Sequence, residues 1–428
     1  MNSTIYAARP HNFNNILIAI SFIFYLNTTQ AQIERNVEIF PFIDTAHSQF
    51  KEIFIFWKSY MDELNLENLR NGAQLNKMPE PLKKYWAESE TNAYDFPDLA
   101  YTYLRSKGGV WYTNDNEYLL GVTNRGNNLF QIKTLFNTTR EGPFKGFPSV
   151  MLTIYVRKTS NGLQLENAFT HNMSSLIKDT ANNITYYYPK DYAFADSISI
   201  LLNQRIEQFK KGFNIENTKP IIYVLSNRLT AISQLFGIDY NYFDYASIAN
   251  TIQGGYTLVN NMIFIGGGGE NYLHEIIHLL LSDYERGSYS FFEEGIATYF
   301  GEHVGRTYDE NMFHFKSFLV QNEWIDLSQS FYGYFNDTLN NRSDTLQPNI
   351  QADRVPFRDF DSNYNFQYMV HAALCDIAFN YCGYEIVKEL YLCKADNEED
   401  FYKCIEEVLE IKRADLNDSI RDFVNRNY

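Results

Sequence analysis

The chain has 428 residues, of which 45% are hydrophobic and 17% aromatic, as expected for a globular protein of about two or three domains. This composition excludes a largely disordered chain. The formal net charge is −16, and Lys and Arg form no cluster of the kind that phosphate binding requires, so we expect no nucleic-acid partner.

The first 31 residues have the pattern of an export signal. Arg9 precedes an apolar run from Ile16 to Leu26, and small and polar residues follow up to Ala31. Such a run is too short to cross a bilayer comfortably, so we expect a signal peptide that is cleaved after Ala31. The mature protein would then be secreted, periplasmic or on the cell surface, without a transmembrane segment. The alternative is an N-terminal anchor or a buried helix.

Residues 32–180 are predicted to form an α+β accessory domain for substrate or partner binding. Apolar residues recur at helical spacing over 47–64, and three later segments alternate as half-buried antiparallel strands, namely 116–124, 129–137 and 150–158. Helices packed on one curved sheet in this way weakly resemble the nuclear transport factor 2-like fold, although the two share no motif.

A second unit is predicted over 181–428, with a sheet and two ligand-bearing helices in 181–303 and a helical subdomain in 304–428. In its first part a strand pattern over 182–192 precedes a long helix over 195–213. Further strand patterns follow over 220–226, 253–259 and 262–267, the last two as a β-hairpin. Its last part is mostly helical, notably over 366–379 and 384–392, with a polar loop at about 333–365.

The stretch "NYLHEIIHLL", residues 271–280, carries two histidines four positions apart. On a helix His274 and His278 share one face, so both imidazoles can bind one zinc ion. Glu275 lies beside that face, where it can hold a water molecule and take its proton. A buried helix that happens to carry two histidines is the alternative, and its apolar neighbours suit both interpretations.

A third protein ligand would distinguish a zinc site from a buried helix. The metzincin pattern requires Gly three positions and His six positions after the second histidine, but this chain has Leu281 and Tyr284 there. The segment "SFFEEGIATYFGEH", residues 290–303, follows instead and places Glu294 sixteen positions after His278.

These two segments together resemble the gluzincins, the zinc peptidase clan of thermolysin and aminopeptidase N. In that clan a Glu-Gly-x-Ala segment opens a second helix and carries the third ligand, and "EEGIA" matches it with Glu294. The resemblance therefore implies a thermolysin-like fold for 181–428 and a Zn²⁺ ion held by His274, His278 and Glu294, with Glu275 as the catalytic base.

Two residues near Glu294 on the same predicted helix also have candidate roles. Glu293 lies about 100° away on the same helical turn and is a candidate to bind a substrate amine, with solvent exposure or zinc ligation as alternatives. Thr298, one turn after Glu294, stands where many relatives have an aspartate that orients a ligand. The orienting group would then be weakened or supplied elsewhere.

The resemblance also covers segments on both sides of the motif. In this clan an edge strand that pairs with the substrate backbone precedes the zinc helix, so Gly254, Gly255 and Tyr256 are candidates for substrate binding. A plain hairpin with a glycine bulge is the alternative. Downstream, a tyrosine of a C-terminal helix can stabilise the oxyanion, for which Tyr368 is the first candidate and Tyr364 the second.

All four cysteines lie near the C-terminus, without the paired spacing of a structural zinc site. If Cys375 and Cys382 share one helix, they lie about 10 Å apart along its axis and cannot bond to each other. Export would permit a disulfide that involves Cys393 or Cys404, and four buried thiols are the alternative.

The residues thus predict a secreted zinc-dependent metallopeptidase that hydrolyses peptide bonds of a peptide or protein substrate with a zinc-bound water. The alternative is a catalytically inactive gluzincin-like module that binds glycan or protein at the cell surface. A surface structural protein in which the histidines are merely packed is a further alternative.

Overall fold

The computed structural model describes residues 37–39, 48–64, 77–106, 116–139, 145–216, 219–241, 254–259, 262–282, 290–302, 306–328, 366–393 and 398–428. Within these ranges the chain combines helices with two small sheets, which confirms the predicted α+β class. None of the helices found there is long and apolar enough to cross a bilayer. The predicted signal peptide, the 333–365 loop and Tyr364 lie outside the described residues.

The first sheet contains six of the described strands, in the order β1-β2-β3-β4-β5 with β9 also paired to β4, and four of the described helices lie between β1 and β2 in the chain. Its pairs are antiparallel except for β1 and β2, which run parallel. The elements are α2 (Ser48–Glu63), α4 (Glu80–Lys83), α5 (Glu88–Ala93), α6 (Leu99–Ser106), β1 (Val37–Ile39), β2 (Asn116–Gly126), β3 (Leu129–Asn137), β4 (Pro148–Thr159), β5 (Gly162–Glu166) and α7 (Ala168–Met173).

Alternation in the sequence explains how this unit packs. Along β3 every second residue is buried, including Phe130, Ile132 and Phe136, and these side chains meet the apolar face of α2 with Trp57 and Tyr60 in one core. The helix predicted at 47–64 and the three predicted strands are therefore confirmed. The likeness to the nuclear transport factor 2-like fold stays a prediction.

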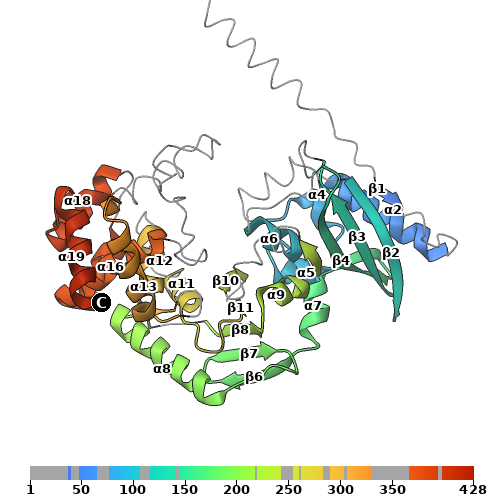
Figure 1. The fold of residues 1–428 in the computed structure, drawn as a ribbon. Helices are drawn as coiled ribbons and strands as arrows, with labels where there is room; N and C mark the ends of the chain where they lie inside the picture. The colour runs from blue at the N-terminus through green and yellow to red at the C-terminus, as the bar shows by residue number, and fades with distance from the viewer. Residues whose placement is uncertain are drawn as a thin grey trace, which may run out of the picture.

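The second sheet lies between the first sheet and the C-terminal helices (Figure 1). Its five described strands have the order β10-β11-β8-β7-β6, in which β11, β8 and β7 run parallel and the two edge strands run antiparallel to their neighbours. The elements are β6 (Ile177–Ala181), β7 (Ile184–Tyr188), α8 (Asp196–Phe213), β8 (Ile221–Ser226), β10 (Gly254–Val259) and β11 (Met262–Gly266).

The two units share their cores through the second sheet. Tyr223 of β8 and Ile263 of β11 face the core of the helical part, whereas Val224 and Phe264 point the other way and belong to the core of the first unit. After β8, helix α9 (Leu229–Leu235) leads to β9 (Ile238–Asn241), which pairs with β4 of the first sheet. The boundary at 180/181 stays a prediction, but the chain returns to the first unit beyond it.

The helical part surrounds two short helices, α11 (His274–Ser282) and α12 (Ser290–Phe300), and α12 packs along α16. Cys375 and Cys382 both lie on α16 and do not bond to each other, as predicted. Both are free, whereas Cys393 and Cys404 form a disulfide between the end of α17 and α18. The remaining elements are α13 (Tyr308–Gln321), α16 (Phe366–Cys382), α17 (Tyr384–Leu392), α18 (Glu398–Leu409), the 3-10 helix η3 (Arg413–Asp415) and α19 (Leu416–Asn427).

Glu166 at the end of β5 lies beside the side chains of Arg157 and His171. Arg157 donates to both of its carboxylate oxygens, and Nε2 of His171 lies 2.9 Å from Oε2. Burial opposes ionisation of Glu166, but the hydrogen bonds from His171 and Arg157 outweigh it and hold the pKa of this carboxyl below its usual value of 4.5.

We expect Glu166→Gln to lower the free energy of unfolding by about 1 to 3 kcal/mol at pH 7, the range for a hydrogen bond to a charged group. Because the pKa is lowered in the folded state, this contribution is present above about pH 4.5 and is lost as the pH falls below it. Urea unfolding at pH 7 and pH 3 tests this, with exposed Glu389→Gln as the control. An equal difference between wild type and variant at both pH values would contradict it.

Candidate metal centre

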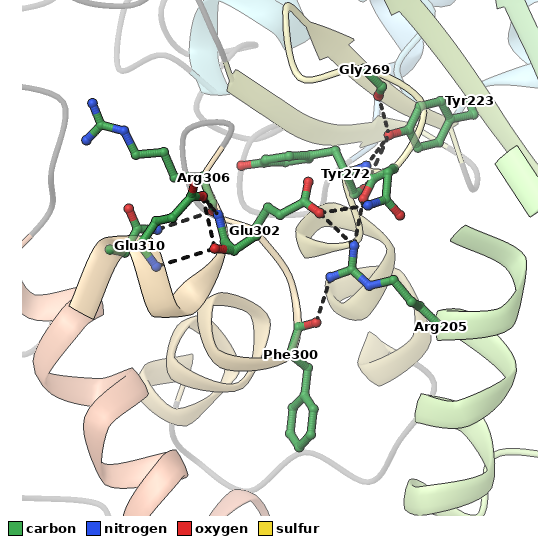
Figure 2. A network of polar contacts seen from close by, with 11 residues as sticks. Arg205, Tyr223, Gly269, Tyr272, Phe300, Glu302, Arg306 and Glu310 are labelled. Atoms are coloured by element: carbon green, nitrogen blue, oxygen red, sulfur yellow. Dashed lines mark hydrogen bonds and ion pairs between the residues drawn. The ribbon is translucent and has the colours of Figure 1, made fainter. Parts of the chain in front are cut away.

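The segment that enters α11 is held against β8. Oη of Tyr223 donates to the carbonyl of Gly269 over 3.1 Å and accepts from the backbone N–H of Tyr272 over 3.2 Å, as Figure 2 shows. Gly269 has a φ of +74°, a left-handed conformation that favours glycine. These hydrogen bonds fix the turn relative to β8, and α11 begins directly after the turn at His274.

Three candidate ligand atoms converge between α11 and α12. His274, His278 and Glu294 each offer one atom, and these atoms all lie within 4.8 Å of one another. Oε2 of Glu294 is 3.4 Å from Nε2 of His274 and 3.4 Å from Nε2 of His278. Two ligands at about 2.1 Å from a tetrahedral ion are roughly 3.4 Å apart, so these residues can hold a metal ion.

The partners of Glu294 also suit a shared cation. Its Oε2 is buried and, among the described residues, makes no well-formed hydrogen bond although it lies between two ring nitrogens. Burial opposes the charged form of Glu294, but His274 and His278 outweigh burial and hold the pKa of this carboxyl far below its usual range. The Glu294 side chain is 31% exposed, so its carboxylate is only partly solvated and is stabilised by positive charge beside it.

His278 lies between two carboxylates of α12. Its Nδ1 is 3.1 Å from Oε1 of Glu293, while its Nε2 points to Glu294. Burial opposes protonation of this imidazole, but Glu293 and Glu294 outweigh burial, with a smaller contribution from Glu275, and raise its pKa to about 10. Glu275 is thus near enough to His278 to act on it electrostatically.

A network around Arg205 of α8 joins the start of α11 to the end of α12 (Figure 2). Nη1 of Arg205 donates to the carbonyl of Asn271, before α11, and to Oε1 of Glu302, and Nη2 donates to the carbonyl of Phe300 at the end of α12. Asn271 Nδ2 donates to the same Glu302 oxygen over 2.9 Å. The start of α11 and the end of α12 are therefore fixed relative to each other.

The contacts of Arg205 were not predicted from the sequence. A signal was present, because Arg205 lies between the core positions Leu202 and Phe209, at a helical spacing that places it toward the interior. A cation at such a position requires acceptors, but the sequence does not tell which ones.

Two glycines allow the helices to approach closely. A Cβ on Gly301 would lie 2.8 Å from both the backbone N and the Cα of His274, and 2.4 Å from the carbonyl oxygen of Ala297. A Cβ on Gly295, the residue after Glu294, would lie 2.9 Å from the backbone of His371 on α16. A side chain at either position would push the neighbouring backbone away, and at Gly301 that backbone belongs to the candidate ligand His274.

The other predicted site residues are placed as follows. Tyr368 on α16 is half-buried, and its ring stacks nearly parallel to that of His274 with centroids 6.4 Å apart. Gly254, Gly255 and Tyr256 lie on β10, the edge strand of the second sheet, paired with β11. The predicted order of edge strand, second strand and ligand-bearing helix is confirmed. The roles in oxyanion stabilisation and substrate binding stay predictions.

No protein-family model matches the chain, and no curated protein matches it in sequence.

We expect Gly301→Ala to lower the free energy of unfolding by about 1 to 3 kcal/mol, because the added methyl group has only backbone to displace. The same shift should weaken metal binding, since the atoms in the way belong to His274. Gly121→Ala is the matched control, because a Cβ there meets nothing within 4 Å. Chemical denaturation and a metal titration test both effects, and equal results for the two variants would contradict the expected close contact.

Proposed function

We propose that the protein is an exported zinc-dependent hydrolase, most specifically a peptidase of the gluzincin kind. The observation that carries the proposal is the meeting of His274, His278 and Glu294 at distances that fit one ion. Two imidazoles and one carboxylate are the protein ligands of many catalytic zinc sites, which leave a position for water. Bound zinc supplies a Lewis acid that activates water and polarises a carbonyl.

Glu275 would act as the general base. It follows His274 on α11, its side chain is buried, and its charge contributes to the raised pKa of His278. Its carboxylate would accept a proton from the attacking water and pass it to the leaving amine. A site for metal or protein binding alone has no use for such a base, which weighs against the binding-module alternative.

Tyr368 is the proposed donor to the oxyanion. Its ring stacks beside His274, the first residue of the ligand cluster, and its half-buried position leaves part of the side chain accessible. A hydroxyl that donates to developing negative charge lowers the barrier without changing its own protonation state.

A peptide is the proposed substrate because of the strand beside the site. Among the described strands β10 pairs only with β11, and α11 packs near it. The other edge of β10 can pair with an extended chain, with Gly254, Gly255 and Tyr256 along the contact. This arrangement supports a peptide bond presented to the metal centre.

Export is supported by the disulfide between Cys393 and Cys404, since such bonds persist in oxidising compartments. It agrees with the signal-peptide pattern of the first 31 residues.

We expect the purified wild-type protein to contain about one zinc ion per chain, as a catalytic site with three protein ligands does. His278→Ala and Glu294→Ala should lose it, because each removes one of the three ligands. The exposed His314→Ala is the matched control and should retain the metal. Elemental analysis after dialysis decides the matter, and a wild-type protein without zinc, unable to take it up, would refute the proposal.

We expect Glu275→Gln to keep zinc and to lose peptide hydrolysis by about 10²- to 10⁴-fold in kcat, the contribution of a general base. The amide is similar in size to the carboxylate but cannot accept the proton. Exposed Glu389→Gln is the control and should keep full activity. Cleavage-site profiling of a peptide library with both variants gives the measurement, and unchanged turnover in Glu275→Gln would show that another group is the base.

A further inference from the structure

We infer that Glu293 positions the metal centre by holding the ring of His278, and that it is not a contact for a substrate amine. The inference rests on the proposed metal-binding function of the site. It assigns to this residue a role that differs from the one predicted from the sequence.

The geometry of His278 carries the inference. Oε1 of Glu293 lies 3.1 Å from Nδ1, and Nε2 on the other side of the ring lies 3.4 Å from Oε2 of Glu294. A neutral imidazole carries its proton on one nitrogen only. A carboxylate at Nδ1 keeps the proton there, so that Nε2 presents its lone pair to the ion.

Burial makes this contact specific. The side chains of Glu293 and His278 are only 14% and 18% exposed, so water competes poorly for the hydrogen bond. Both carboxylates come from the same turn of α12, one on each side of a single imidazole. Helix α12 therefore supplies a metal ligand and, one residue earlier, the group that orients another ligand.

Thr298 supplies no comparable contact to the ring of a described histidine. This residue lies one turn after Glu294, where many of the zinc peptidases that the sequence resembles have an orienting aspartate. Here the side chain is fully buried, and its Oγ1 has no hydrogen-bond partner among the described residues. In this chain the orienting carboxylate lies instead before Glu294, and it acts on the second histidine of the motif.

A consequence for the substrate follows from the same contact. A substrate amine that bound Glu293 would compete with Nδ1 of His278 for the negative charge of this carboxylate and so weaken the contact that orients the ring. Glu293 is therefore a poor group for anchoring the N-terminus of a peptide.

The test is a competition titration of the full chain with a chromogenic chelator and Zn²⁺. Glu293→Ala should bind zinc about 10- to 100-fold more weakly than wild type, the usual cost of losing a group that orients a ligand. Glu293→Gln keeps an acceptor for Nδ1–H and should lose less. The exposed Glu389→Ala should bind like wild type. The visible spectrum of the Co²⁺ form should change in Glu293→Ala, since the ring of His278 is freed.

Unaltered zinc affinity in Glu293→Ala would overturn the inference, above all if the same variant raises KM for peptides with a free N-terminus and not for blocked ones. Complete loss of zinc in Glu293→Ala with retention in Glu294→Ala would also overturn it, since Glu293 would then be a ligand itself. If Glu293→Ala does not fold, Glu293→Gln must still show the weaker binding. A wild-type protein that binds no zinc refutes the proposed function, which separates the two failures.

Discussion

The close packing of α11 against α12 is the constraint on which the rest of the structure depends. Two helices that each carry part of a ligand set have to approach until His274, His278 and Glu294 come within 4.8 Å of one another. The lack of a side chain at Gly301 permits that approach. The hydrogen bonds of Arg205 hold the start of α11 and the end of α12 together. The chemistry proposed for the site is thus a consequence of packing between short elements.

Charge balance is the second determinant of the site. Glu275, Glu293 and Glu294 surround two imidazoles in a largely buried region, an arrangement that favours positive charge at its centre. Although burial opposes both charges, the pKa of His278 is raised and that of Glu294 is lowered because each group interacts with the opposite charge of the other. A divalent ion satisfies these carboxylates together, whereas a protonated imidazole satisfies fewer of them.

The second sheet connects the site to the N-terminal unit. Its parallel strands are buried on both faces, so Tyr223 reaches the turn before α11 from one face while Val224 packs into the other core. The first unit is therefore continuous with the scaffold of the metal centre through β8, β9 and β11. An accessory domain attached by a linker would lack this continuity. Strand β9 lies beyond the predicted boundary at 180/181 and yet pairs with β4, so local sequence patterns could not describe how the two units share their strands.

Local patterns in the sequence determined several of the helices and strands and pointed to the candidate metal ligands. Alternation marked β3, helical spacing marked α2 and α8, and the spacing of His274, Glu275 and His278 indicated one face of a helix, because such periodicities are properties of the backbone. Tertiary structure alone decided that Glu293 faces Nδ1 of His278, that Arg205 meets Glu302, and that β9 joins the first sheet. These contacts join residues whose proximity depends on how helices and strands pack, and no local periodicity encodes that.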